Sequence, residues 1–249
     1  IGNEKMDELC RTLKDFSDIM KAYKVENYRA YGTSAIRETE NTTIVQDRIA
    51  QRTGIKVEIL NNSEQRFMDY KSVASKGESF RKIIEEKTAI LDIGGGSIQL
   101  SLFDNDTLVS TQNVRLGVLR IQDYLNRFDV KGSQMEEVIY EMAMARLDTY
   151  EKLYLKDRGI QNLIIVDDYL SPWAVKKNGG DSARAVLDAE SFGRVFEVLR
   201  SQNPVKIATA MDIPQERIPL VFISAVLIKC IAELMGVKRI WTPGVTLCD

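Results

Sequence analysis

The sequence predicts an α/β protein of two domains, and three observations support this fold class. In the first third of the chain, helical and strand patterns alternate, which favours a mainly parallel sheet covered by helices. Three strand patterns then follow one another, separated only by short glycine-rich and Asx turns, which is typical of an antiparallel meander. The chain has 249 residues, 44% hydrophobic and 28% charged, as in ordinary globular proteins. We expect domains over residues 1–86 and 87–249.

The expected first domain opens with a helix, because apolar residues from Met6 to Tyr23 recur at steps of three and four. Asn41 and Ser63 are good N-cap residues for two further helices, and Gly54 stands where a left-handed residue would end the first of them. The elements expected after the opening helix are a strand, a helix, a strand and a helix, over residues 28–33, 42–53, 57–60 and 63–74.

The polar stretch of residues 75–87 is the expected domain boundary. The meander follows it, with strands over residues 88–93, 98–103 and 108–114. Beyond the meander, the pattern predicts a long helix, a strand, two helices and a last strand, over residues 133–157, 163–166, 188–200, 214–235 and 239–241.

The charge balance and the cysteines limit the partners and the compartment. With 34 basic and 36 acidic residues the net charge is −2, which argues against nucleic-acid and anionic-membrane binding. The apolar runs reach about ten residues, against the roughly twenty that a membrane span needs. Three scattered cysteines and the lack of a signal-peptide pattern predict a cytoplasmic location.

The chain contains no histidine. This excludes catalytic triads that use histidine, imidazole general bases and ordinary histidine-ligated zinc sites. Any chemistry must therefore use carboxylates, amides, hydroxyls, backbone N–H groups and a hard metal ion.

The sharpest local signal is Asp92 followed by Gly94, Gly95, Gly96 and Ser97, at the end of an apolar strand. Three consecutive glycines allow backbone N–H groups to converge on an anionic oxygen, and the aspartate can hold a hard cation. The run is neither a P-loop nor a dinucleotide fingerprint, since no Gly-Lys-Ser follows and the next element is a strand. The alternative is a plain glycine-rich hairpin with a solvated aspartate.

Two more candidates follow strands of the first domain. Arg37 stands where ligands gather at the carboxyl ends of strands, and its planar guanidinium suits phosphate, although a surface ion pair with Glu38 is the alternative. Glu64 opens a helix, where a carboxylate is ordinarily placed to complement the helix dipole. Its functional interpretation is a base that orients and deprotonates an attacking water.

Together these motifs resemble the exopolyphosphatase/guanosine pentaphosphate phosphatase (Ppx/GppA) family, in the right order and spacing. The motifs are YGTSAIRE, EILNNSEQRF, DIGGGSIQL and RLG, at residues 31–38, 58–67, 92–100 and 115–117. The resemblance implies a two-domain fold of the actin, sugar kinase and Hsp70 type, with a phosphate-binding cleft between the domains. Family proteins begin with a further strand–turn–strand, so the first domain is expected to be truncated.

Residue by residue, the resemblance implies Glu64 as the glutamate that activates water, Asp92 as a ligand of Mg²⁺, and a phosphate-binding set. That set is Arg37, Gly94, Gly95, Gly96 and Ser97. Assigning Glu64 requires a one-residue deletion in the preceding turn, whereas the ungapped register places Gln65 there, and an amide cannot take a proton.

The chain also departs from the family pattern at three places. Gln99 stands where the family has a glutamate, and Val166–Tyr169 with Asp167 and Asp168 replaces a glycine-rich phosphate loop. Two carboxylates there should repel phosphate or first recruit a cation. Residues 244–248 differ from the family's C-terminal motif as well.

The leading hypothesis is a phosphohydrolase that acts on phosphoanhydride ends of polyphosphate or guanosine pentaphosphate with Mg²⁺. The alternative is a regulator that binds polyphosphate or guanosine polyphosphate without turnover, as Gln99 and the altered loop would favour. A sugar kinase shares the fold but finds no support beyond the glycine turn. The expected partner is the phosphate ligand, with no nucleic acid and no membrane, and a homodimer is compatible with this.

Overall fold

The computed structural model describes residues 1–156, 158–177, 179, 186–201 and 203–246. The chain forms two compact units, Ile1–Gln65 (unit 1) and Arg66–Asp249 (unit 2). The division falls within helix α4, Asn62–Ala74, rather than at the 86/87 boundary expected from the sequence. The stretch expected to be the domain boundary contains helix α5, Glu78–Ile84, whose Phe80 and Ile84 are buried against the sheet of unit 2.

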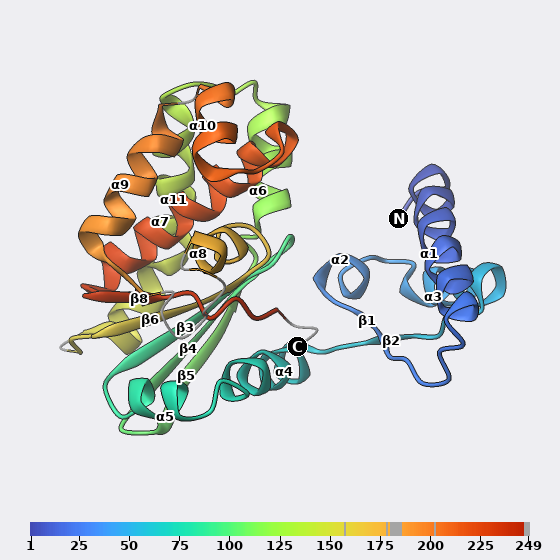
Figure 1. Ribbon diagram of the computed structural model, residues 1–249, viewed down its shortest axis with the longest axis horizontal. Helices are drawn as coiled ribbons and strands as arrows, with labels where there is room; N and C mark the ends of the chain where they lie inside the picture. The colour runs from blue at the N-terminus through green and yellow to red at the C-terminus, as the bar shows by residue number, and fades with distance from the viewer. Residues whose placement is uncertain (157, 178, 180–185, 202, 247–249) are drawn as a thin grey trace. The chain divides into compact units, whose positions relative to one another are not determined.

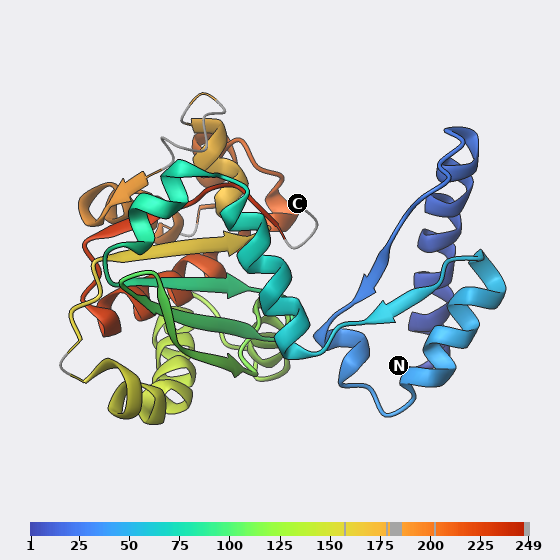
Figure 2. The same cartoon turned by 90° about the horizontal axis from the view of Figure 1, so that it is seen from below.

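Unit 1 is built on two parallel strands, β1 (Ala30–Gly32) and β2 (Val57–Ile59), in which Ala30 pairs with Val57. The helices of the unit before α4 are α1 (Asn3–Ala22), α2 (Ser34–Arg37) and α3 (Thr42–Thr53). Helices α1 and α3 pack against each other, as Figure 2 shows, and bury Met6, Cys10, Val45, Ile49 and Ile55. Gly54 ends α3 in the left-handed conformation, as predicted.

Unit 2 contains a six-stranded sheet with the strand order β5-β4-β3-β6-β8-β7. The predicted meander is confirmed, because β4 pairs antiparallel with both β3 and β5. Strand β6 runs parallel to β3 and to β8, and β7 pairs antiparallel with β8 at the edge. The strands are β3 (Thr88–Ile93), β4 (Ile98–Asp104), β5 (Thr107–Val114), β6 (Asn162–Asp167), β7 (Val186–Asp188) and β8 (Arg239–Trp241).

The two faces of this sheet are covered by different helices (Figure 1). Because successive side chains of a strand point to opposite faces, Ala89, Leu91 and Ile93 lie on one face and Ile90 and Asp92 on the other. The first face packs against the larger helices of the unit. These are α6 (Val118–Arg127), α7 (Gln134–Tyr150), α9 (Ala189–Arg200) and α11 (Ile218–Met235). The second face packs against α4 and α5.

Several short elements were not predicted because each is too short to show a clear period. They include α8 (Ser171–Lys177) and α10 (Pro204–Met211), whereas the π-helical turn Glu151–Leu155 and the 3₁₀ turn Gln215–Arg217 lie inside the helices predicted over residues 133–157 and 214–235. The π-helical turn continues α7, so the helical stretch expected over residues 133–157 is two elements; residue 157 lies outside the described part of the chain.

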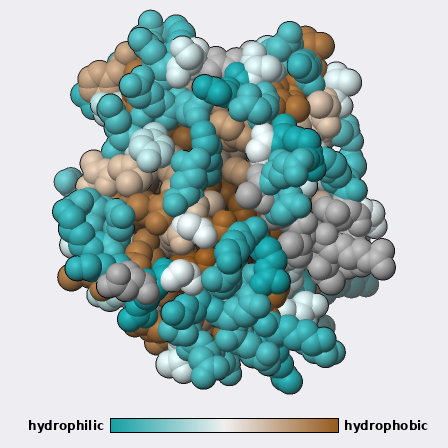
Figure 3. Space-filling view, turned by 90° about the vertical axis from the view of Figure 1, so that its left-hand side faces the viewer, coloured by the Kyte–Doolittle hydropathy of each residue, from teal (hydrophilic) through white to brown (hydrophobic). Residues whose placement is uncertain are grey.

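One helix among the described residues, Gln215–Met235, is long and apolar enough to cross a membrane by length and composition. The sequence expectation of no such segment rested on uninterrupted apolar runs, and the helix mixes apolar residues with uncharged polar ones such as Ser224. In the structure 67% of its apolar window is buried, as in the central helix of a protein core. On the face shown in Figure 3, polar side chains cover most of the surface and apolar ones show in the hollows between them.

Candidate functional site

The glycine run joins β3 to β4 in a tight turn. The N–H group of Gly94 donates to the carbonyl of Ser97 at 3.0 Å, so only Gly95 and Gly96 lie inside the turn. Among the described residues, no acceptor takes the N–H groups of Gly95, Gly96 or Ser97. The three glycines are partly exposed, so the N–H groups of Gly95 and Gly96 are available to an anion from solvent, whereas Ser97 is buried at the end of the turn.

The carbonyl groups of the turn face the start of α6. Val118 and Leu119 donate their N–H groups to the carbonyls of Gly94 and Gly95, both at 3.0 Å, and the Arg120 Nε donates to Gly96 at 2.9 Å. In a planar trans peptide the N–H group points opposite to the carbonyl. The turn therefore satisfies the first N–H groups of α6 while it directs its own N–H groups away from that helix.

Close packing on α6 explains why glycine is needed here. A Cβ atom on Gly117 would lie 2.3 Å from the carbonyl oxygen of Gly95, and one on Gly95 would lie 2.9 Å from the Leu119 Cδ1 atom. The glycine of the RLG motif thus allows the turn to contact the helix start.

Asp92 lies near the end of β3, directly opposite Gln99 of β4, on the sheet face that α4 covers. Asp92 is 9% exposed and Gln99 is 3% exposed. The Nε2 atom of Gln99 has no hydrogen-bond partner among the described residues. The strand pairing thus places a carboxylate and an amide side by side next to the glycine turn.

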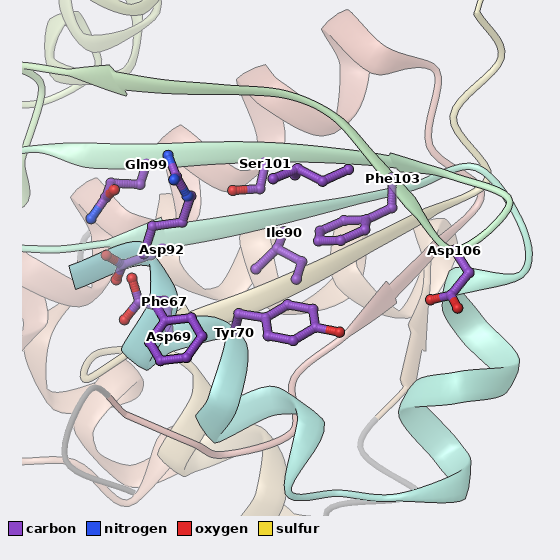
Figure 4. Close-up of a pocket in the computed structure, with 11 residues that line it drawn as sticks. Phe67, Asp69, Tyr70, Ile90, Asp92, Gln99, Ser101, Phe103 and Asp106 are labelled. Carbon is purple, nitrogen blue, oxygen red and sulfur yellow. The ribbon is translucent and has the colours of Figure 1, made fainter. Parts of the chain in front are cut away.

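A second carboxyl group, on Asp69 of α4, faces Asp92 (Figure 4), and the sequence reasoning missed it. Asp69 is 3% exposed, and neither of its oxygens accepts a hydrogen bond from a nitrogen or hydroxyl group in the described part of the chain. Burial, and after it the charge of Asp92, raises the pKa of Asp69 to about 9. The available signal was its spacing on α4, four residues before the buried Val73.

These side chains line one end of a cavity of about 320 Å³ within unit 2. At the other end the rings of Tyr70 and Phe103 stack with centroids 5.8 Å apart, and Ile90 lies between (Figure 4). Arg66 also lines the cavity, and its Nη1 donates to the Thr111 hydroxyl at 3.1 Å. The cavity therefore has an acidic end beside the glycine turn and an apolar body.

Glu64 takes part in a capping box at the start of α4. The Asn61 Oδ1 atom accepts from the N–H groups of Ser63 at 2.8 Å and Glu64 at 2.9 Å, while Glu64 Oε2 accepts from the Asn61 N–H at 2.8 Å. The predicted N-cap at Ser63 is wrong, because Asn61 satisfies the free N–H groups two residues earlier. Glu64 is exposed, so one carboxylate oxygen has a structural role while the group faces solvent.

Arg37 lies in unit 1 at the end of α2. Its Nη1 donates to the Leu60 carbonyl at 2.6 Å and to the Gln65 Oε1 at 3.3 Å. Its Nη2 is buried and has no hydrogen-bond partner among the described residues. The guanidinium is thus anchored by one nitrogen and keeps donors on the other, which suits binding of an anion.

The Asp167–Asp168 pair does not act as two phosphate-facing carboxylates. Asp167 Oδ1 accepts from the Ser171 N–H at 2.7 Å, and Oδ2 accepts from the Leu170 N–H at 2.9 Å and the Ser224 hydroxyl at 2.8 Å. The buried Asp167 therefore caps α8, and Asp168 is the exposed member of the pair. Of the altered C-terminal motif, residues 247–248 lie outside the described residues.

The structure brings Asp92, the glycine turn and Gln99 together within unit 2 and adds Asp69, whereas Glu64 and Arg37 belong to unit 1. Their predicted grouping around one phosphate stays a prediction. In the described part of the chain, no group of three or more histidine, cysteine, aspartate or glutamate residues could hold a metal ion. Two facing carboxylates and an amide nevertheless fit a hard cation such as Mg²⁺, which prefers oxygen ligands.

An α/β fold of two units and a glycine turn that presents N–H groups beside an aspartate are features typical of proteins that bind phosphate. Comparison with known families identifies which one. The sequence model of the Ppx/GppA phosphatase family matches residues 1–235, and the chain belongs to this family.

Solved structures confirm the predicted fold class. An exopolyphosphatase from Cytophaga hutchinsonii superposes with a TM-score of 0.78 at 21% identity, over 99% of this chain and 80% of that one. The Aquifex aeolicus Ppx/GppA family member superposes with a TM-score of 0.67 at 12% identity, over 99% of this chain and 78% of that one. The chain thus has the α/β fold of these Ppx/GppA proteins, which is the fold family that the motifs implied.

Curated relatives match over shorter stretches. Exopolyphosphatase 1 of Mycobacterium leprae is 32% identical over 102 residues, which is 41% of this chain and 29% of the relative. A bifunctional 3-dehydroquinate synthase/phosphatase of Fusobacterium nucleatum is 25% identical over 125 residues, 49% of this chain and 18% of that protein. The matches therefore span less than a third of the relatives' own length.

Proposed function

We propose that the protein is a phosphohydrolase that cleaves terminal phosphoanhydride bonds of inorganic polyphosphate or guanosine pentaphosphate. The observation that carries this proposal is the turn Gly94–Ser97, which presents three N–H groups beside Asp92 in a member of a phosphatase family. The names of the exopolyphosphatase relatives support polyphosphate as the substrate class.

Phosphoryl transfer depends mainly on positioning and on stabilising the charge of the transferred group. The N–H groups of Gly95, Gly96 and Ser97 would bind the terminal phosphate, and Arg37 would offer its Nη2 donors to the same anion. These donors are fixed by other contacts of the turn and of Arg37, so they need little reorganisation when the substrate binds.

Glu64 would orient the attacking water and accept its proton. The capping box fixes the carboxylate at the helix start through Oε2. A fixed and solvent-facing carboxylate can act as a general base without histidine. Its partner in the reaction is expected to be the phosphate at the glycine turn.

Asp92 would hold Mg²⁺ through its carboxylate, close to the turn that binds the phosphate. When bound, the ion neutralises negative charge on the phosphate oxygens. Asp92 and the Gly94–Ser97 turn are joined by a single residue, so the cation-binding and phosphate-binding groups come from one short segment.

The experiment is phosphate release by the full-length protein with polyphosphate and with guanosine pentaphosphate, each with Mg²⁺ and with a chelator. We expect Mg²⁺-dependent release from at least one of the two substrates. The proposal fails if neither substrate releases phosphate at any Mg²⁺ concentration.

A phosphate-binding regulator without turnover is the second candidate. It is favoured by two observations: Glu64 already serves the capping box, and position 99 carries an amide. In that case the same assay shows no release, while polyphosphate still protects the protein against thermal unfolding.

A further inference from the structure

Asp69 carries a buried carboxyl group whose one hydrogen-bonding neighbour among the described residues is another carboxyl group, that of Asp92. It is 3% exposed, and neither oxygen accepts from a nitrogen or hydroxyl group among the described residues. Burial of an ionised carboxylate costs several kcal/mol unless a positive charge or donors compensate it. The ionised form of Asp69 therefore needs a positive charge beside it, whereas the neutral form can share a proton with Asp92.

The groups around Asp69 are oxygen ligands rather than donors of positive charge. The carboxyl group of Asp92 faces it, and Gln99 stands opposite Asp92 in the β3–β4 ladder. The Gln99 amide is 3% exposed, and its Nε2 has no partner in the described part of the chain. Rotation of the amide can turn its oxygen towards the carboxylates, since both orientations fit the same side-chain shape.

These three side chains come from α4, β3 and β4, all within unit 2, and all of them line the cavity of about 320 Å³. An ion can therefore reach them from solvent. Among the described residues that line the cavity, Arg66 is the only basic one, and its guanidinium donates to Thr111.

We propose that Asp69 is a ligand of a divalent cation that Asp92 and Gln99 also hold. In the family pattern a glutamate at position 99 supplies this carboxylate, and here Asp69 supplies it from α4. This inference rests on the proposed function, because the cation is the one assigned above to Asp92. The helix thus restores the charge of a site in which a strand position has changed from glutamate to glutamine.

The test is a titration of the full-length protein with Mn²⁺, without substrate, followed by the paramagnetic resonance signal of the free ion. Mn²⁺ prefers the same carboxylate ligands as Mg²⁺. We expect Asp69→Asn to weaken Mn²⁺ binding by at least about tenfold, and Asp69→Asn with Gln99→Glu to restore most of the affinity. The matched control is Asp106→Asn, an exposed acidic residue of the same cavity, which should bind Mn²⁺ like the wild type.

Two results would overturn the inference: Asp69→Asn binding Mn²⁺ as tightly as the wild type, or no recovery in the double variant. The first would mean that Asp69 and Asp92 merely share a proton. Failure of the proposed function looks different, because the wild type would then bind Mn²⁺ but release no phosphate from either substrate. Thermal unfolding of each variant verifies that it is folded.

Discussion

The two faces of the sheet in unit 2 differ sharply in the residues they bury. One face carries Ala89, Leu91 and Ile93, which pack against α6, α7, α9 and α11 in a continuous apolar core. The other face is apolar at Ile90 and Phe103 but carries Asp92 and Gln99 at the end that adjoins the glycine turn. Polar groups without hydrogen-bond donors are costly inside a protein. The first face therefore stabilises the fold, whereas the buried polar groups of the second face lower its stability and form the candidate site.

The largest effect is expected at Glu64, where structural and catalytic roles can be separated. Glutamine also serves at the third helical position of a capping box, so Glu64→Gln should leave the unfolding temperature almost unchanged. Because an amide cannot accept a proton, turnover should fall by about 10²–10⁴-fold. Phosphate release and thermal unfolding of the full-length protein measure the two effects. Unchanged turnover would show that Glu64 only caps α4.

Substitutions on the apolar face of the sheet should instead lower the free energy of unfolding. Leu91 is 0% exposed, and Leu91→Ala should cost about 2–5 kcal/mol of unfolding free energy through lost burial and a cavity. The control Leu153→Ala, at a side chain 67% exposed, should change it by less than about 0.5 kcal/mol. Denaturant unfolding gives both values. Equal losses for the two variants would contradict the assignment of this face to the core.

Gly117 tests the contact that orients the glycine turn. Gly117→Ala would place a methyl group 2.3 Å from the Gly95 carbonyl oxygen, so the turn must move, at a cost of about 1–3 kcal/mol. It should also weaken binding of inorganic phosphate, since the N–H groups lose their common direction. Gly193→Ala is the matched control, because a Cβ in that interior position of α9 meets no atom within 4 Å. That variant should gain about 0.4–1 kcal/mol and bind phosphate unchanged.

A pH-dependent gain in stability is expected for Asp69→Asn without divalent cations. The pKa of Asp69 is about 9 in the folded protein, against about 3.9 for an unfolded aspartate. Between these values the folded state binds more protons than the unfolded state, so stability falls as the pH rises through that window. Asparagine removes this dependence, so the variant's gain in unfolding temperature should be larger at pH 8 than at pH 5. Parallel pH profiles of both proteins would contradict the burial of an unbalanced carboxyl group.

Sequence patterns predicted the parts of this structure that depend on residues close together in the sequence. The meander follows from period-two strands and short turns, and Asp92 with its three glycines could be singled out because the residues are adjacent. Gly117 was visible only as part of a motif, because its role depends on contact with Gly95.

The residues that were missed or misread depend on contacts distant in sequence. Asp69 and Asp92 meet only because α4 covers one face of the sheet, and a polar residue at an inward position of a helix does not reveal its partner. Asp167 was taken for a phosphate-repelling group, whereas its oxygens accept from α8 and from Ser224 of α11. The sequence gives the chemical type of each side chain, but its partners depend on tertiary packing.

The central claim is that the polar end of the second sheet face is a cation-dependent phosphate site. The most direct measurement is Mg²⁺-dependent phosphate release from polyphosphate by the full-length Asp92→Asn variant beside the wild type, with unfolding temperatures recorded for both. The account predicts that release falls by at least about 10²-fold, because Asp92 holds the charge-neutralising ion, while the variant stays folded. Wild-type rates in a folded Asp92→Asn protein would contradict it.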